Sequence, residues 1–216
     1  MSRLSLEQIW PPFALGITAG DLQLTVVREG DLPELLELVL DGVHDPTQMP
    51  FLFPWTDAPA DELPANYVRY FGRTLAGQSR ETISLQLVVR RSGRVVGIQA
   101  LEGQGFPVTR TLETGSWLGR RFHGQGIGTR MRQAVCAVAF DHLGAEHITS
   151  SAFLDNPASL AVSRKVGYRP NGRQWVSRRG KAAEQERLLL TPSTFVRGEP
   201  VHVDGAAALR VFCGIA

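Results

Sequence analysis

Apolar positions recur along this chain at the spacings of helices and strands. Leu32, Leu35, Leu36, Val39 and Leu40 form a helical stripe behind Asp31, which we expect to cap that helix. Further helices are predicted over 62–77, from 127 to about 143, and over 157–166. Strands are predicted at 22–28, 84–90, 94–100, 113–118, 147–153, 174–178 and 186–190, with Ser92-Gly93 in a hairpin turn. This order, with strands early and helices interrupting later, favours an α+β fold.

Composition narrows the class of protein. The 216 residues are 43% hydrophobic and 20% charged, which is ordinary for one globular domain with a proper core. A net charge of +2 argues against nucleic acid or an anionic membrane as the partner. No apolar run approaches the length of a membrane span, and the first residues lack the apolar centre of a signal peptide. Cys136 and Cys213 form no disulfide framework, so we expect a cytoplasmic protein.

A glycine-rich segment, Arg-Phe-His-Gly-Gln-Gly-Ile-Gly-Thr at 121–129, separates the strand at 113–118 from the helix that follows. Glycines at 124, 126 and 128 permit a tight loop with converging amides, and a helix N-terminus favours a pyrophosphate. A glycine-rich turn without a ligand is the alternative. The loop lacks the Gly-Lys-Ser/Thr ending of a P-loop and the spacing of a dinucleotide fold, which argues against a nucleotide-phosphate enzyme.

A second segment at 156–168, Asn-Pro-Ala-Ser-Leu-Ala-Val-Ser-Arg-Lys-Val-Gly-Tyr, follows about 30 residues later. Arg121, Gly124 and Gly126 resemble the acyl-CoA-binding motif of the GNAT superfamily of N-acyltransferases. The later segment resembles the family's Asn-x-x-Ala/Ser and Gly-Phe/Tyr positions. The resemblance is nearest to the RimJ/RimL-type branch and spans roughly 22–190.

The resemblance implies a twisted mixed sheet of six or seven strands, whose fourth and fifth strands splay apart around the acyl chain and pantetheine arm. Residues 1–190 would form this acyltransferase domain. Acyl-CoA, as acetyl-CoA or succinyl-CoA, would be the co-substrate, and no metal is expected. The expected cofactor-binding residues are Trp117, Leu118, Arg121, His123, Gly124, Gln125, Gly126, Gly128, Thr129, Asn156, Ser159 and Ser163.

The implied activity is transfer of the acyl group to a primary amine of a protein or small molecule by direct attack, which depends mainly on positioning. Strand amides near Trp117 and Leu118 would polarise the carbonyl. For the base we favour Glu113, because the family often has a glutamate there; a solvated edge-strand carboxylate is the alternative. Asp155 is the second candidate and His123 the third.

The expected general acid departs from the family pattern. Ser163 stands where many members have tyrosine, and serine is a far poorer acid. Either Ser159 or Ser163 hydrogen-bonds the sulfur, or water protonates it. Asn156, Ser159 and Ser163 share one helix face that would suit the cofactor arm, although Asn156 and Gly167 also suit plain helix caps. A non-catalytic acyl-CoA-binding or sensing domain, without a working base, is the alternative function.

Two apolar segments lie outside these motifs. Residues 42–56 carry Phe51, Phe53 and Trp55 in an irregular loop, which either covers the core or forms a wall of the acceptor pocket. Residues 191–216 form an apolar C-terminal extension, with a strand at Val201 and Val203 and a helical turn at 206–210. This tail would be a lid over the acyl site or a subunit contact; we favour the contact, and therefore a homo-oligomer.

Overall fold

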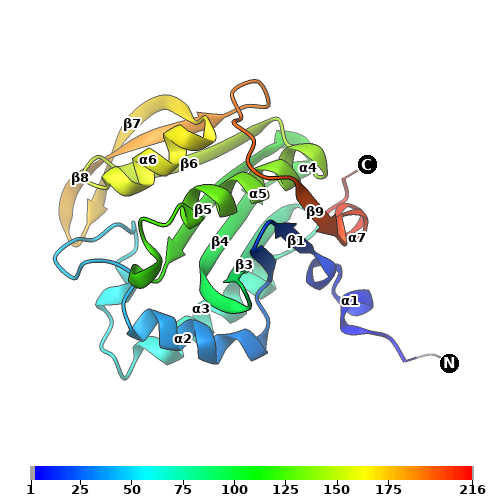
Figure 1. Ribbon diagram of the computed structural model, residues 1–216, viewed down its shortest axis with the longest axis horizontal. Coiled ribbons are helices and arrows are strands. Elements are labelled where there is room, and N and C mark those ends of the chain that lie inside the picture. Colours follow the sequence, from blue (N-terminus) through cyan, green and yellow to red (C-terminus); the bar gives the residue numbers. More distant parts are fainter. Residues whose placement is uncertain (1–2, 216) are drawn as a thin grey trace.

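All strands of the described chain, residues 3–215 of a computed structural model, join one mixed sheet (Figure 1). The strands are β1 (Gly16–Ala19), β2 (Leu22–Val26), β3 (Thr82–Arg91), β4 (Arg94–Gln104), β5 (Thr111–Leu118), β6 (His147–Phe153), β7 (Arg169–Arg178), β8 (Lys181–Leu190) and β9 (Val201–Asp204). Their order across the sheet is β7-β8-β6-β5-β4-β3-β2-β1-β9. The predicted α+β class is confirmed.

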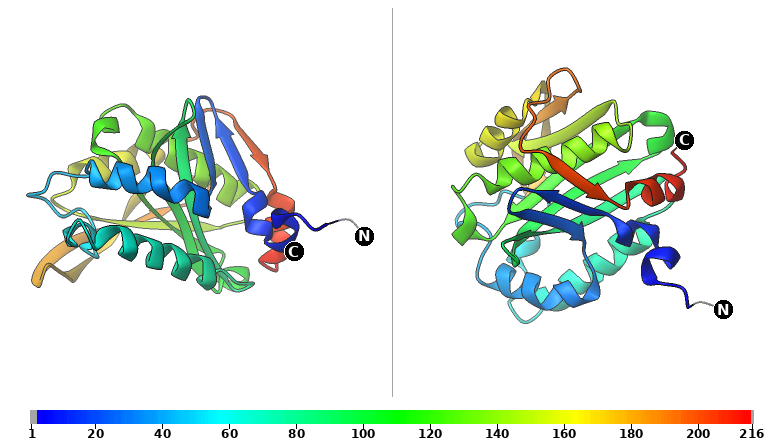
Figure 2. Two further views of the ribbon diagram at one scale, coloured as in Figure 1. Left: turned by 90° about the horizontal axis from the view of Figure 1, so that it is seen from below. Right: turned by 45° about the vertical axis from the view of Figure 1, so that its right-hand side comes forward.

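Helices cover both faces of this sheet (Figure 2). They are α1 (Leu6–Ile9), α2 (Leu32–Leu40), α3 (Leu63–Gly77), α4 (Phe106–Thr109), α5 (Ile127–Asp141), α6 (Pro157–Val166) and α7 (Ala206–Phe212), with short 3-10 segments η1 (Pro11–Ala14), η2 (Glu29–Asp31), η3 (Trp55–Asp57) and η4 (Arg120–Phe122). Helices α2 and α3 pack against β4 and β3, while α5 lies on the other face against β1, β4 and β5. No helix in residues 3–215 is long and apolar enough to cross a membrane.

The sheet has nine strands, more than the six or seven expected, because two short strands extend the edge beyond β2. Strand β1 is only four residues, too short to show a clear period, and the sequence did not predict it. Strand β9 pairs antiparallel with β1, placing Val203 opposite Ile17. The tail strand expected at Val201 and Val203 therefore completes the chain's own sheet.

Strands β5 and β6 are the splayed pair that the resemblance implied. They are parallel, but they pair only where Thr111, Leu112 and Glu113 face residues 147–149. Beyond Glu113 the strands diverge, and β6 continues by pairing with β8. At the point of divergence, the Ser150 hydroxyl donates to the Thr114 carbonyl across 3.1 Å. The sheet thus opens into a gap beside residues 115–118, which we call the acyl gap.

The helix caps and the hairpin turn named here agree with those predicted from the sequence, with one exception. Asn156 caps α6 by accepting from the Ser159 N–H at 3.1 Å, and Gly167 ends that helix at φ +103°. Ser92 and Gly93 form the β3–β4 turn with positive φ. The expected capping of α2 by Asp31 is wrong: its carboxylate accepts from the Arg28 N–H at 2.7 Å and holds the 3-10 turn before the helix. That competing local bond is a common use of an aspartate side chain.

The C-terminal tail packs on its own chain at the sheet edge opposite β7 (Figure 1). Leu209, Cys213 and Ile215 are buried in the main core, and α7 lies against η1. Part of the apolar tail is therefore covered by the chain itself, while Val211 remains 79% exposed. Homo-oligomerisation stays a prediction.

Candidate active site

The glycine loop between β5 and α5 is held in a left-handed backbone conformation. Gly124 has φ +74° and Gly126 has φ +77°, backbone angles that residues other than glycine rarely adopt. A Cβ at either position would meet no other atom within 4 Å, so both glycines border open space. The loop is thus shaped by backbone conformation and leaves room beside it.

The amides of this loop are free. Within the described residues, no hydrogen bond is recorded for the backbone N–H groups of residues 124–128. Helix α5 begins at Ile127, and its cap Gly126 has no side chain to satisfy the first turn. Free amides at a helix N-terminus bind anions, because the N–H groups and the helix dipole favour negative charge. The loop fits the pyrophosphate of a CoA molecule.

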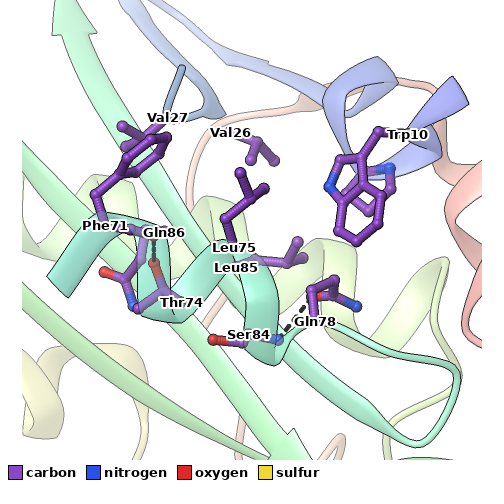
Figure 3. Close-up of a pocket in the computed structure, with 11 residues that line it drawn as sticks. Trp10, Val26, Val27, Phe71, Thr74, Leu75, Gln78, Ser84, Leu85 and Gln86 are labelled. Carbon is purple, nitrogen blue, oxygen red and sulfur yellow. Dashed lines mark hydrogen bonds between the residues drawn. The ribbon is translucent and has the colours of Figure 1, made fainter. Parts of the chain in front are cut away.

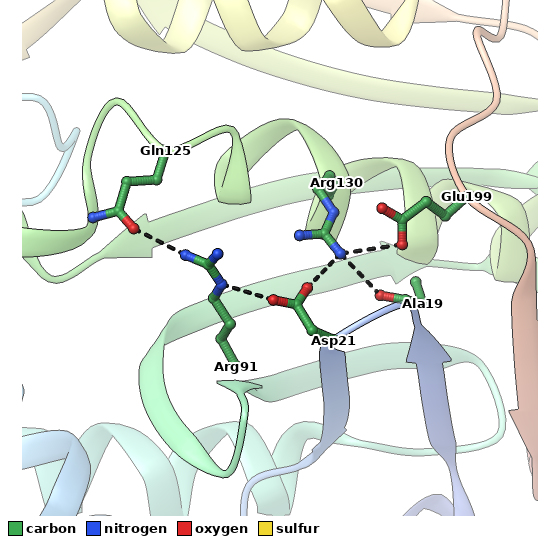
Figure 4. Close-up of polar contacts among 6 residues, drawn as sticks. All are labelled: Ala19, Asp21, Arg91, Gln125, Arg130 and Glu199. Carbon is green, nitrogen blue, oxygen red and sulfur yellow. Dashed lines mark hydrogen bonds and ion pairs between the residues drawn. The ribbon is translucent and has the colours of Figure 1, made fainter.

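A polar network joins this loop to two hairpins and the tail (Figure 4). The Gln125 amide oxygen accepts from Arg91 at 2.9 Å, and Arg91 pairs with Asp21 at 2.8 Å. Arg130, in the first turns of α5, pairs with Asp21 at 2.5 Å and with Glu199 at 3.1 Å. Gln125 is therefore held by Arg91 of the β3–β4 hairpin. The spacing of residues in the sequence could not predict this contact.

Other predicted loop residues have structural partners. Arg121 is exposed, pairs with Asp41 at 2.9 Å and directs its guanidinium toward the end of α2. A His123 ring nitrogen lies 3.1 Å from the Leu118 carbonyl, so His123 packs on the end of β5. A Cβ on Gly128 would lie 3.5 Å from Val162, which places the first turn of α5 against α6. Thr129, one residue further along this turn, is half-buried.

The three polar residues predicted on α6 differ in what they can offer. The Asn156 side-chain oxygen already caps the helix. Ser159 is half-buried, and its hydroxyl has no recorded partner in the described chain. Ser163 is fully buried, and its Oγ accepts from Arg132 Nη1 at 3.1 Å. Of the two serines considered for the sulfur, Ser159 has the more open position.

Glu113 projects from the face of β5 opposite to the one that carries Thr114 and Ser116, and a second carboxylate lies beside it. Glu102 on β4 is its direct antiparallel neighbour, and it was not among the predicted site residues because the predicted strand ended at residue 100. No basic side chain pairs with either carboxylate in the described residues. Burial, and secondly the charge of Glu113, raises the pKa of Glu102, while Gln86 donates to it at 2.8 Å. Two unpaired carboxylates side by side favour a bound cation.

An open position and an aromatic wall adjoin this pair. Next along the same face of β5 is Gly115, where a Cβ would meet only Ala100, at 3.9 Å. Trp117 follows, and its ring centroid lies 6.0 Å from that of Trp55 in the segment of residues 42–62 between α2 and α3, which we call the 42–62 loop. Successive ring contacts join four aromatic side chains into one wall: Phe51, Trp55, Tyr67 and Trp117. The apolar loop therefore covers a small core cluster and also borders the exposed face of β5.

An ion pair and a hydrogen bond fix this loop to the β7–β8 hairpin. Arg178 makes two bonds to Asp155, at 2.8 and 2.6 Å, and donates to the Met49 carbonyl at 3.1 Å. Arg179 likewise holds Asp57 in the loop. The bonds from Arg178 lower the pKa of Asp155, so this second candidate for the base is a weaker proton acceptor.

A separate recess lies between α3, β3 and η1 (Figure 3). Its lining is mostly apolar, including Trp10, Val26, Phe71 and Leu85, and Gln86 at its edge is the residue that donates to Glu102. No group of three or more His, Cys, Asp or Glu side chains in residues 3–215 could hold a metal ion.

The splayed sheet, the amide-lined loop and the carboxylates beside the gap define a domain of the acyltransferase type. Residues 21–169 match the acetyltransferase (GNAT) domain, and the chain belongs to that family.

Solved structures of acetyltransferases share the fold. One is RimJ of Mycobacterium smegmatis in complex with CoA-disulfide, with 17% identity, a TM-score of 0.66, and coverage of 94% of this chain and 95% of that one. RimL, a ribosomal L7/L12 α-N-protein acetyltransferase in complex with CoA, has 19% identity, a TM-score of 0.62, and coverage of 80% and 95%. The spermidine N-acetyltransferase of Vibrio cholerae, in complex with CoA and spermine, has 16% identity, a TM-score of 0.58, and coverage of 81% and 97%.

Proposed function

We propose that this protein transfers an acyl group, acetyl first and succinyl second, from acyl-CoA to a primary amine by direct attack. The observation that carries the proposal is the unpaired carboxylate pair of Glu102 and Glu113, placed where β5 and β6 separate. The loop at 124–128 would hold the pyrophosphate, and the thioester would lie in the acyl gap.

The proposed mechanism follows from the two faces of β5. An ammonium approaching over Gly115 would meet the Glu113 carboxylate on the same face. Glu113 accepts a proton from the nitrogen, and the free amine attacks the carbonyl carbon. The nitrogen then loses its second proton to water, the carbon–sulfur bond breaks with its electron pair on sulfur, and water protonates the departing thiolate. Holding both reactants in one site supplies most of the acceleration, as expected for a direct displacement.

The acceptor site favours a cationic amine beside an apolar group. Glu102 and Glu113 supply negative charge, and Trp55 and Trp117 supply an aromatic surface next to it. The named neighbours act on a protein α-amine and on spermidine, and both acceptors are primary amines. The charges fit either class, so the acceptor library should contain peptides with free N-termini as well as polyamines.

The test is turnover of acetyl-CoA and succinyl-CoA with this amine library, followed by mass spectrometry. Glu113→Gln should lower kcat about 100-fold or more, as expected for a lost general base, with little change in CoA affinity. Glu37→Gln, an exposed change on α2, is the matched control. Full activity of Glu113→Gln would refute the assignment of the base.

A non-catalytic acyl-CoA-binding domain is the remaining alternative. It predicts that CoA raises the thermal stability of the parent protein while no acyl-CoA is consumed with any amine.

A further inference from the structure

Arg132 is a buried cation without a counter-ion. It projects from α5 with 4% of its surface exposed, and no carboxylate in residues 3–215 pairs with it. Its Nη1 donates to Ser163 at 3.1 Å and its Nη2 to Ser116 at 2.8 Å. Its Nε has no partner in the described chain. Burying a guanidinium without an opposing charge carries a large desolvation free energy, so the position of Arg132 requires an explanation.

A second unsatisfied atom lies in the same part of the sheet. Gln99 is fully buried on β4 directly opposite Ser116, and its side-chain oxygen has no partner within the described residues. Its amide nitrogen is used, donating to the Gly115 carbonyl at 2.9 Å. The side chains of Arg132 and Gln99 both adjoin Ser116, and each has one buried polar atom without a hydrogen-bond partner in the described chain. Such a pair indicates a polar site that a bound molecule could satisfy.

This place adjoins the acyl gap. Ser116 belongs to the part of β5 that has separated from β6, and Ser163 belongs to α6 on the other side. Arg132 therefore bridges the two walls of the gap. Because Ser116 is half-buried and Ser163 is fully buried, Ser116 is the hydroxyl that a molecule in the gap can reach.

The two contacts also orient the hydroxyls. Each serine oxygen accepts from the guanidinium, so its own O–H remains free to donate elsewhere. Breaking the thioester leaves an electron pair on sulfur, and serine is a poor acid for neutralising it. A hydroxyl donor backed by a buried positive charge stabilises that anion without transferring a proton, and a low dielectric strengthens the effect.

We propose that Arg132 is a positioning residue for the leaving thiol: acting through the Ser116 hydroxyl, it stabilises the negative charge on sulfur as the carbon–sulfur bond breaks. This inference rests on the proposed function for the reaction, but its consequence for bound CoA can be measured without turnover.

The other titratable groups near Arg132 stay neutral. Cys136, on the same helix, has its pKa raised to about 12 by burial. Burial also raises the pKa of Tyr168 well above its ordinary value, and the hydroxyl of Tyr168 shares a 2.7 Å hydrogen bond with Thr114. Glu113 lies on the opposite face of β5. A titration of bound CoA near neutral pH therefore reports the thiol of CoA and the charge of Arg132.

The experiment is an ultraviolet titration of the CoA thiolate in complex with the full protein. A nearby guanidinium should lower the pKa of the bound thiol by about 1 from its ordinary value of about 8.5. In Arg132→Met this shift should disappear; in Arg132→Lys and Ser116→Ala it should be smaller. Arg197→Met, which removes an exposed partner of Asp141 at the end of α5, should match the parent.

Kinetics provide the second readout. Arg132→Met should lower kcat about 100-fold, as for loss of one preorganised donor, with KM for acetyl-CoA little changed. If Arg132→Met does not fold, Arg132→Lys and Ser116→Ala carry both tests.

A bound thiol with an ordinary or raised pKa in the parent, or an equal pKa in the parent and the variants, would overturn the proposal. A loss confined to succinyl-CoA would also overturn it, because Arg132 would then recognise the carboxylate of the acyl group. Failure of the proposed function looks different: the parent transfers no acyl group, while the titration still measures the influence of Arg132.

Discussion

The two sides of the acyl gap are built in different ways. The cofactor side comes from one stretch of chain, in which β5, the glycine loop, α5 and α6 follow one another between residues 111 and 166. The acceptor side combines segments far apart in sequence: the 42–62 loop, Glu102, Glu113 and the tip of the β7–β8 hairpin. The cofactor side contains most of the recognisable sequence motifs. The acceptor side contains the groups that would determine specificity for the amine.

The two sides also differ in how they are held. Helix α5 lies in the main core through buried apolar residues from Ile127 to Ala139. The 42–62 loop is tied to the hairpin by the exposed Arg179–Asp57 ion pair, which is a weak kind of contact, and by a hydrogen bond from Arg178 to the Met49 carbonyl. The proposed cofactor site thus lies on the part of the domain that is packed into the main core, and the proposed acceptor site lies on surface segments that can change without disturbing the core.

Both sides depend on the same sheet, and the tail completes it. A chain ending at Gly198 would lose β9 and α7 and uncover Ile17 and its neighbours. Loss of the buried Leu209 and Ile215 alone removes about 3–6 kcal/mol, a large part of the stability of a typical domain. We therefore expect an unfolded or aggregated product by circular dichroism and light scattering. A soluble, folded monomer derived from a dimeric parent would instead restore the subunit-contact interpretation.

Gly126→Val should disable the cofactor side alone. At φ +77° a β-branched residue is strained, and its side chain enters the space in front of the free amides. The stabilisation that CoA gives the parent should disappear, as measured by thermal unfolding at increasing CoA concentration.

Gly126→Asn is the matched control, since asparagine tolerates the left-handed region. It should recover the stability of the unliganded protein while still obstructing CoA. A full CoA effect in either variant would exclude this loop as the pyrophosphate site.

Arg178→Met should disturb the acceptor side alone. It removes the bonds that Arg178 makes to Asp155 and to the Met49 carbonyl, and so loosens the 42–62 loop. KM for the amine should rise about 10-fold, the equivalent of 1.4 kcal/mol, while CoA affinity stays constant. Arg173→Met is the control, because Arg173 is an exposed arginine on the same hairpin and pairs with Glu184 of that hairpin. Equal losses of amine and CoA binding would mean that the two sides are not separable.

The sequence predicted the strand, loop and helices of the cofactor side because their signals are local. Alternating glycines, an N-cap at Asn156 and a glycine end at Gly167 each act within a few residues. Glu102 was missed because its meaning depends on the pairing of β4 with β5, and Arg132 because an arginine on an apolar helix face gives no sign of its serine partners. The strand and helix of the tail were predicted, but not their place in the sheet, because strand β1, which pairs with the tail, is too short to predict.

Glu102→Gln should give the smallest effect, and it tests the carboxylate pair directly. The pKa of Glu102 is raised by burial and by Glu113, so the folded protein holds this proton more tightly than the unfolded chain. The ionised carboxylate therefore destabilises the folded state as the pH rises above the unfolded pKa of about 4.3. Glu102→Gln should be more stable than the parent at neutral pH, and the difference should vanish in acid. Thermal unfolding across this range measures it. A variant less stable than the parent at pH 7 would show that Glu102 is held by a favourable partner, and that the pair is no site for a cation.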